Sequence, residues 1–545
     1  MLRLARYLLV PFLVGAISLG AAWAGVATAP APQVTPEGLA EATNVAKGAA
    51  SKVEVNRSQS TRADAAAATA RVGAEAQRAI SALMAAPNAG QVLAGAAKVN
   101  IAPRPDASKG ETWAKEGCAI LGDDAPSGAT HVPNFRSPWP ENPSCIYMGG
   151  YGLGPMNPIT SFDEEYGLWV RSVAIGDGQD TIVLTILDGT SYLGDYNRFC
   201  DDCGAFELAR DLGAELDIDP AGLMFASTHS HTGPDFIGGW GGVPEWYMQQ
   251  VTEALRTSVR KSVSRMRPAT LEAGDVLSRE FNGERRDTYR SAESDTLSWF
   301  RATSARSGKT IATVGAYAAH PVTVDPAGVG DADFPAVFDK ALERRFGGVG
   351  LYFMKGLGNL SPRGDKVKMG EGLAALIPAA GGGTPVDGTD VRAARAMWDQ
   401  PVTNSGLTAL GVPGFFDRPF AQKPAAVRIG KSETRPCTSA SPVSVNTGIT
   451  AAKVGNLTVT GAPGETFSNL ANTIEERNPS GVSLPLAQVN DGLGYIIQNF
   501  ESYPEARQGT GFVGANTFEY EDAYSIDQCF GDMVLETTLQ VLGNL

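Results

Sequence analysis

The feature that most constrains the fold is an alternation, from residue 96 onward, of short apolar runs with clusters of turn-forming residues. The apolar runs have the length and composition of β-strands. Examples are DTIVLTILDGT (180–190), GLMFAST (222–228), TIATVGAYAAH (310–320), GLYFMKGLGN (350–359) and LTVTGAPGE (457–465). Residues 243–263 instead repeat their apolar side chains with the period of an amphipathic helix. We therefore predict an α/β fold with mixed β-sheets and flanking helices.

The amino terminus has the pattern of an export signal. Two arginines precede an uncharged run at 7–29, which contains Ala-x-Ala sites at 22–24 and 27–29. Residues 1–29 are therefore predicted to be a signal peptide, and the protein to be exported to a periplasmic or extracellular space. The same run is long enough to span a bilayer, so the protein is membrane-anchored if the signal is not cleaved.

Composition divides the rest of the chain into two parts. Residues 30–95 are rich in Ala, Glu, Thr and Ser and predict a helical or low-complexity spacer without a core of its own. Residues 96–545 are predicted to form the folded domain. The formal net charge of -14 excludes a nucleic-acid partner, because binding to phosphate backbones requires clustered Lys and Arg.

The six cysteines suit disulfide bonds in an exported protein. Six cysteines allow 15 connectivities. The pairing that we predict is Cys118 with Cys145, Cys200 with Cys203, and Cys437 with Cys529. The two aspartates between Cys200 and Cys203 would oppose a thiolate, which argues against a redox-active pair.

Three of the four histidines follow apolar runs, and they are the first candidates for metal ligands. His229 and His231 follow the run at 222–228, and His320 ends the run at 310–320. Residues two apart in a strand point to the same face, so His229 and His231 can converge on one ion. Such a pair with a distant third ligand is typical of catalytic zinc, although spacing alone leaves hydrogen-bonded or surface histidines open. His131 has no partner nearby in the sequence.

Three other polar residues follow strand-like runs. Glu465 follows a Pro-Gly turn, Ser361 precedes Pro362, and Tyr495 lies between Gly and two Ile residues. A carboxylate at such a position can bind a metal or act as a base. The structural alternatives are a solvated Glu, a capping Ser and a core Tyr.

Taken in order, several motifs resemble the neutral/alkaline non-lysosomal ceramidase family, whose members are zinc amidases that split ceramide into sphingosine and a fatty acid. The motifs are MGGYG (148–152), LDGT (187–190), THSHTGP (228–234), AHPVTV (319–324), GNLSP (358–362), APGE (462–465) and GYII (494–497). The resemblance covers 96–545. It implies a ceramidase-like catalytic domain alone, without the immunoglobulin-like carboxy-terminal domain of the family.

The resemblance implies a Zn²⁺ site in which His229, His320, Glu465 and Tyr495 bind the metal. Zinc would polarise the substrate amide and lower the pKa of water toward about 7.

The resemblance also implies catalytic residues. His231 would lie beside the substrate amide, for proton transfer or carbonyl binding, and Ser361 would act as a nucleophile or as a partner of the attacking water. An arginine of the family corresponds to Arg285 or Arg286, of which we take Arg285 as the candidate.

Several positions depart from the family pattern, and two of these departures bear on the substrate. Asn359 replaces an Asp, and DFIGGW (235–240) replaces a Gly-Gly pair. Two alternatives to a ceramidase therefore stay open: a zinc hydrolase of the same scaffold that acts on a different amide or ester, and a catalytically inactive exported binding protein.

A lipid-like substrate requires an apolar mouth near the zinc. Four residues after the histidine pair can line an acyl groove or touch a bilayer as a peripheral membrane contact, namely Phe236, Ile237, Trp240 and Trp246. The alternative is a buried Gly-rich loop packed by aromatic side chains. The acidic turn with Asp331 and Asp333 is either a second ion site or a solvated turn.

Overall fold

The structure is a computed structural model that describes residues 91–118, 144–151, 154–196, 202–286, 294–430, 436–478, 481–502 and 520–545. The predicted signal peptide, His131 and Cys200 lie outside the described residues, as does nearly all of the predicted spacer. The first described strand begins at Val92.

Within the described residues, nine strands form one large mixed sheet. They are β1 (Val92–Asn100), β3 (Trp169–Gly176), β4 (Thr181–Leu187), β5 (Leu223–Ser227), β6 (Arg267–Leu277), β8 (Thr296–Ser304), β9 (Thr310–Tyr317), β11 (Val349–Met354) and β13 (Thr384–Pro385). The order is β11-β9-β8-β6-β1-β3-β4-β5, with β13 paired to β6. The pairs β4–β5 and β9–β11 are parallel and the other pairs are antiparallel, which confirms the prediction of mixed pairing.

A second sheet stacks on the first. Its strands, in order, are β14 (Val391–Pro401), β17 (Ser444–Val454), β18 (Leu457–Gly461) and β20 (Ser483–Leu486). Alternate residues of β4 explain why this strand is apolar throughout: Ile182, Leu184 and Ile186 share a buried core with the second sheet. Val183 and Leu187 point to the opposite face, where helices cover them.

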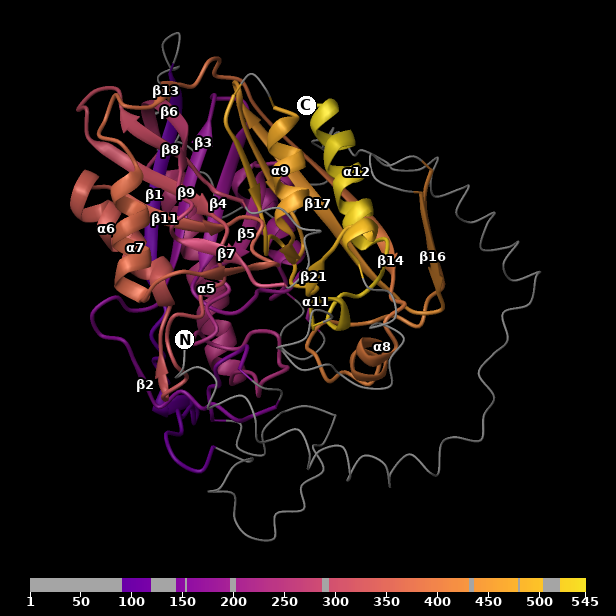
Figure 1. Cartoon of the computed structure of the whole chain (residues 1–545). Helices are drawn as coiled ribbons and strands as arrows, with labels where there is room; N and C mark the ends of the chain where they lie inside the picture. The colour runs from indigo at the N-terminus through magenta and orange to yellow at the C-terminus, as the bar shows by residue number, and fades with distance from the viewer. Residues whose placement is uncertain are drawn as a thin grey trace, which may run out of the picture.

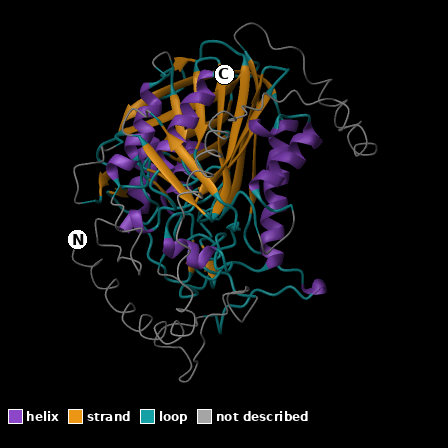
Figure 2. Cartoon of the chain, turned by 90° about the vertical axis from the view of Figure 1, so that its right-hand side faces the viewer, coloured by secondary structure: helices purple, strands orange, loops and turns teal. Residues whose placement is uncertain are grey.

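Helices cover the outer faces of both sheets and complete a four-layer arrangement (Figures 1 and 2). The first sheet is covered by α4 (Ala205–Leu216), α5 (Glu245–Ser264), α6 (Asp333–Phe346) and α7 (Lys366–Leu376). The second sheet is covered by α9 (Ser468–Glu476) and α12 (Phe530–Gly543). This architecture confirms the predicted α/β class and the helix predicted at 243–263. In the described part of the chain, no helix combines the length and apolar character needed to cross a bilayer.

Short strand pairs at the ends of the sheets carry several of the predicted site residues. These pairs are β2 (Ser161–Phe162) with β10 (Val329–Gly330), β7 (Asn282–Glu284) with β12 (Leu360–Pro362), β15 (Ala425–Ile429) with β16 (Cys437–Ser441), and β19 (Glu465–Thr466) with β21 (Tyr495–Ile496). The large sheet also curves until β11 lies against β3, β4 and β5. This curvature brings strands together that lie far apart in the strand order.

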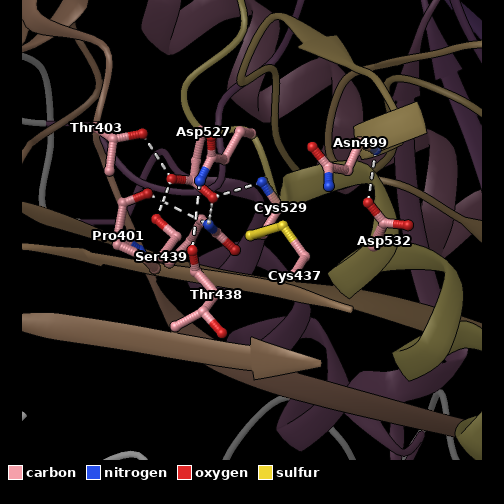
Figure 3. Close-up of a disulfide and its surroundings, with 11 residues drawn as sticks. Pro401, Thr403, Cys437, Thr438, Ser439, Asn499, Asp527, Cys529 and Asp532 are labelled. Carbon is pink, nitrogen blue, oxygen red and sulfur yellow. Dashed lines mark hydrogen bonds between the residues drawn. A yellow bond between two sulfur atoms is a disulfide. The ribbon is translucent and has the colours of Figure 1, made fainter. Parts of the chain in front are cut away.

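Two predicted disulfides are confirmed, Cys118–Cys145 and Cys437–Cys529. Cys203 is also disulfide-bonded, but its predicted partner lies outside the described residues. Figure 3 shows Cys437 of β16 joined to Cys529, the residue before α12. Beside this disulfide, the Asp527 carboxylate accepts hydrogen bonds from the Thr403 hydroxyl at 2.6 Å and from the Cys529 amide at 2.8 Å. Covalent and polar contacts therefore fasten the carboxy-terminal segment to strand β16 and to the residues that follow β14.

Candidate active site

His229 and His231 converge, but not through the strand geometry that the sequence suggested. Strand β5 ends at Ser227, and His229 has a φ of 57°, in the left-handed region that non-glycine residues rarely adopt. Their two Nε2 atoms lie 3.4 Å apart. The prediction that both histidines lie on one strand face is therefore wrong, and a turn after the strand brings them together instead. Backbone strain of this kind is concentrated at functional sites.

The ring of His229 is oriented by a backbone carbonyl. Its Nδ1 lies 2.9 Å from the carbonyl oxygen of Thr190, which follows the parallel neighbour strand β4. A carbonyl only accepts hydrogen bonds, so Nδ1 carries the hydrogen and Nε2 presents a lone pair to the site. Thr190 ends the LDGT motif, and this contact gives that motif a structural role.

His320 has the same arrangement. It follows β9, it is fully buried, and its Nδ1 lies 3.1 Å from the carbonyl oxygen of Leu360. Its Nε2 therefore also presents a lone pair. Burial, and then the nearby charge of Arg285, lower the pKa of His320 to about 4, so the ring is neutral at pH 7.

The Glu465 carboxylate faces both lone pairs. Its Oε2 lies 3.0 Å from Nε2 of His320 and 3.4 Å from Nε2 of His229. Burial alone raises the pKa of Glu465, but His229 and His320 hold it well below its usual range, so the group is ionised. A carboxylate this close to two imidazole nitrogens needs a cation beside it, either a proton on Nε2 or a metal ion.

The spacing of these donor atoms fits a metal ion. Ligand atoms of a tetrahedral zinc site, each about 2.0–2.2 Å from the metal, lie about 3.3–3.6 Å apart. The ring nitrogens of His229, His231 and His320 lie within 4.8 Å of one another, and this group can hold a metal ion. The structure thus brings together three of the residues predicted at the site, and Glu465 joins them.

His231 lies at the more open edge of the group and is half-buried. Burial, and then the neighbouring His229 and His320, lower the pKa of His231 well below its usual value, so this ring is also neutral near pH 7. Gly150 packs against the ring so closely that a Cβ there would lie 2.4 Å from its atoms. The ring of Tyr151 packs edge-on against the ring of His231, with the ring centres 5.5 Å apart. The MGGYG motif therefore forms one wall for His231.

Tyr495 and Arg285 lie on the other side of Glu465. Strand β21 places Tyr495 beside Glu465 in parallel register, and its hydroxyl accepts a hydrogen bond of 2.8 Å from Nη2 of Arg285. Burial raises the pKa of Tyr495 well above its usual value, and Arg285 offsets part of that rise. Arg286 turns away and pairs with Asp522 at 3.1 Å. Of the two arginines that the sequence left open, Arg285 is the one at the site.

Two solved structures resemble this chain. The first is a neutral ceramidase from Pseudomonas aeruginosa, which matches with a TM-score of 0.56 and 13% identity over 84% of this chain and 75% of that chain. This chain has the fold of a neutral ceramidase. The second, a ceramidase complexed with C2, has a TM-score of 0.54 and 14% identity over 83% of this chain and 76% of that chain. No family model and no curated protein matches the sequence.

Ser361 lies in the ceramidase fold where strand β12 pairs with β7. Its neighbour Leu360 provides the carbonyl that orients His320. Among the described residues, the Ser361 hydroxyl makes no hydrogen bond to the three histidines or to Glu465. The structure therefore places Ser361 next to the site without a direct contact to the metal-binding group.

Asn359 has a structural explanation. Its side-chain amide donates hydrogen bonds to Oε2 of Glu284 at 2.6 Å and to the Ser468 hydroxyl at 2.8 Å. Burial raises the pKa of Glu284, so a carboxylate is already costly at this position. An Asp at 359 would place a second carboxylate against it. The amide thus matches this chain's own Glu284 and connects β7 to the start of α9.

Sequence reasoning missed several residues that complete the site. Tyr520 packs edge-on against Tyr495, with ring centres 6.0 Å apart, and Glu521 accepts a 2.7 Å hydrogen bond from Arg285. The side-chain amide of Gln488 lies 3.2 Å from Nδ1 of His229. Gln488 has a φ of 57°, but no local sequence pattern marks it.

The loop after the histidine pair is held by a buried carboxylate. Asp235 accepts hydrogen bonds from four backbone amides, those of Ile237, Gly238, Trp240 and Gly242, at 2.7–3.0 Å. Phe236 is fully buried between Tyr192 and Tyr247. For Phe236 the buried-loop alternative is therefore correct, whereas Ile237, Trp240 and Trp246 remain partly accessible.

The acidic turn at 331–333 is closed by its own partners. Lys366 lies 2.5 Å from carboxylate oxygens of both Asp331 and Asp163. Asp333 accepts a 2.8 Å hydrogen bond from the Thr323 amide. These contacts leave no reason to place a second ion there.

Proposed function

We propose that this protein is a zinc-dependent amidase that hydrolyses the N-acyl bond of ceramide or a related N-acyl lipid, releasing a free fatty acid and a sphingoid base. The observation that carries the proposal is the convergence of the Nε2 atoms of His229 and His320 on the Glu465 carboxylate within a ceramidase fold. Nitrogen and carboxylate donors of this kind suit zinc. In this proposal His229, His320 and Glu465 hold the metal, and Tyr495 is the fourth ligand.

The other residues of the site have complementary roles. When bound, zinc supplies Lewis acidity that polarises an amide carbonyl and activates water near neutral pH. His231 is neutral and accessible from one side, so it can take a proton from water and deliver it to the leaving amine. The fixed guanidinium of Arg285 stabilises negative charge that develops near the Tyr495 hydroxyl. Ser361 is proposed as a nucleophile or as a partner of the attacking water.

We also propose that the protein is exported and acts on a lipid. The confirmed disulfides suit an oxidising compartment, in agreement with the signal pattern at 1–29. Trp240 and Trp246, which are partly accessible on the loop after the histidine pair, are the candidates for contact with a membrane surface.

A second candidate is a zinc hydrolase that acts on a different amide or ester. The observation that favours it is the loop built around Asp235, which departs from the family pattern immediately after the histidine pair. A catalytically inactive exported binding protein is the third candidate, and the intact donor set counts against it.

The test is an assay of the purified protein on a fluorescent ceramide, a short N-acyl amine and an ester, with metal analysis of the same sample. We expect about one zinc per chain and zinc-dependent release of fatty acid from ceramide. Ester cleavage without ceramide turnover would favour the second candidate. A protein that holds zinc and cleaves none of the substrates would be a binding protein.

Replacing Gly150 with alanine is expected to lower kcat/KM by about 100-fold, because the new methyl group displaces the ring of His231 and small displacements at a catalytic group are costly. Gly110→Ala is the matched control. Both glycines have positive φ, so both variants lose about 1 kcal/mol of stability, but no atom lies within 4 Å of a Cβ at Gly110. Steady-state kinetics and melting temperatures of the pair check this, and equal activity of the two variants would contradict a role for His231.

A further inference from the structure

Glu521 is a buried carboxylate far from the sequence motifs, and its side chain reaches the site. It lies in the short helix α11 (Tyr520–Ala523) and is 2% exposed. We infer that Glu521 is a positioning residue that fixes Arg285, and through Arg285 the hydroxyl of Tyr495. This inference rests on the proposed function, since it assigns the residue to the same site.

Arg285 donates hydrogen bonds from two of its nitrogen atoms. Nε donates to Oε1 of Glu521 at 2.7 Å, and Nη2 donates to the Tyr495 hydroxyl at 2.8 Å. Nη1 lies 3.4 Å from Nδ1 of His320, but that Nδ1 carries a hydrogen and donates to the Leu360 carbonyl, so the contact is not a hydrogen bond. Of the two bonds, the one to Glu521 is to a carboxylate, and charge-assisted bonds are the strongest of this kind.

Aromatic rings fix the same guanidinium from its faces. Its central carbon lies 5.5 Å from the ring centre of Tyr495 and 5.9 Å from that of Tyr520. Tyr520 directly precedes Glu521, so one short segment provides both a ring and a carboxylate to Arg285. The guanidinium group is planar and rigid, so a carboxylate that fixes one of its nitrogen atoms also fixes the positions of the other two.

The segment that carries Glu521 is itself held in place. Nδ2 of Asn404 donates hydrogen bonds to the carbonyl oxygens of Ala523 and Ser525, both at 2.9 Å. The Tyr495 amide donates to the carbonyl oxygen of Tyr524 at 3.3 Å. The helix is therefore attached both to strand β21 and to the residue that caps α8 (Ser405–Gly411).

The next residue provides a matched control. Asp522 is fully buried in the same helix and pairs with an arginine, Arg286, at 3.1 Å. The guanidinium of Arg286 packs over the Phe467 ring at 5.0 Å, and its Nε lies 3.8 Å from Oε2 of Glu521, farther than the 2.7 Å that separates Nε of Arg285 from Oε1. Removing the charge of Asp522 therefore costs stability as removing that of Glu521 does, without disturbing Arg285.

The experiment compares Glu521→Gln with Asp522→Asn in the full-length protein. We expect similar losses in melting temperature for both variants. Glu521→Gln should lower kcat about 10- to 100-fold with little change in KM, and should weaken zinc affinity about tenfold in a chelator competition, as is typical of groups that orient metal ligands. Asp522→Asn should stay within about twofold of the wild type in both measurements.

A double-mutant cycle tests whether Glu521 acts through Arg285. We expect the variant with Arg285→Met and Glu521→Gln to be no slower than Arg285→Met alone, because the two residues form one unit. Equal kcat and zinc affinity for Glu521→Gln and Asp522→Asn, or additive losses in the cycle, would overturn the inference. A wild type that cleaves no amide would sink the proposed function, and the comparison of zinc affinities would still decide the role of Glu521.

Discussion

His229→Ala and His320→Ala will each lose zinc and more than about a thousandfold of kcat/KM. A bound metal contributes several kcal/mol to the stabilisation of the transition state, and about 4 kcal/mol corresponds to a thousandfold change in rate. Each of these rings points its Nε2 lone pair at Glu465, and a neighbouring side chain cannot replace it. Metal content by elemental analysis and kinetics on the same samples check the prediction.

The matched control is His131→Ala, which removes a histidine for which the sequence indicates no partner. This variant should keep its zinc and its activity. Treating the wild type with a chelator should reproduce the loss, and added zinc should restore activity to the wild type but not to His229→Ala. A His229→Ala protein that retains stoichiometric zinc and wild-type kcat would rule out the proposed ligand set.

Replacing both cysteines of the Cys437–Cys529 disulfide with serine will lower the free energy of unfolding by about 4.5 kcal/mol. The two cysteines are 92 residues apart, and the entropy of closing a loop of that length in the unfolded chain gives this magnitude. The Cys118–Cys145 pair spans only 27 residues, so its removal should cost about 3.5 kcal/mol. Urea unfolding of the two double-serine variants measures both values.

Comparing the two disulfides distinguishes the contribution of loop closure to the free energy of unfolding from the contribution of local hydrogen bonds. Asp527 and its hydrogen bonds remain when the Cys437–Cys529 bridge is removed, so the native fold should persist below the lowered melting temperature (Figure 3). An unchanged free energy of unfolding for Cys437→Ser with Cys529→Ser would show that these polar contacts alone hold the carboxy-terminal segment.

Strands β4, β5, β9 and β11 of the large sheet were predictable because they are buried on both faces. Continuous apolar runs such as that of β4 need no periodic pattern to be recognised. The stacking of a second sheet was not predictable, since it depends on which face of each strand meets which partner. The convergence of His229 and His231 was predicted for the wrong reason, because the strand ends at Ser227 and a left-handed residue makes the turn.

Long-range polar contacts were beyond local sequence patterns. Glu521 lies 236 residues from Arg285, within a charged segment that resembles any solvated turn. Asn359 departs from the Asp of the family pattern, and its own position in the sequence does not explain the change. The Glu284 carboxylate that explains it lies on another strand, 75 residues away. Such pairs become visible only when the short strand pairs at the ends of the sheets are in place.

The proposed metal ligands come from two different sheets, and this has a consequence for how the protein unfolds. His229 and His320 follow strands of the large sheet, whereas Glu465 follows β18 of the second sheet. A zinc ion bound by these residues would be a cross-link between layers that are otherwise joined by apolar contacts and by non-covalent polar contacts such as the ion pair of Lys355 with Glu475. Separation of the sheets then requires the carboxylate to leave the metal first. Zinc at this site should therefore slow the unfolding rate more than it shifts the unfolding equilibrium of either sheet, and so give the protein kinetic stability.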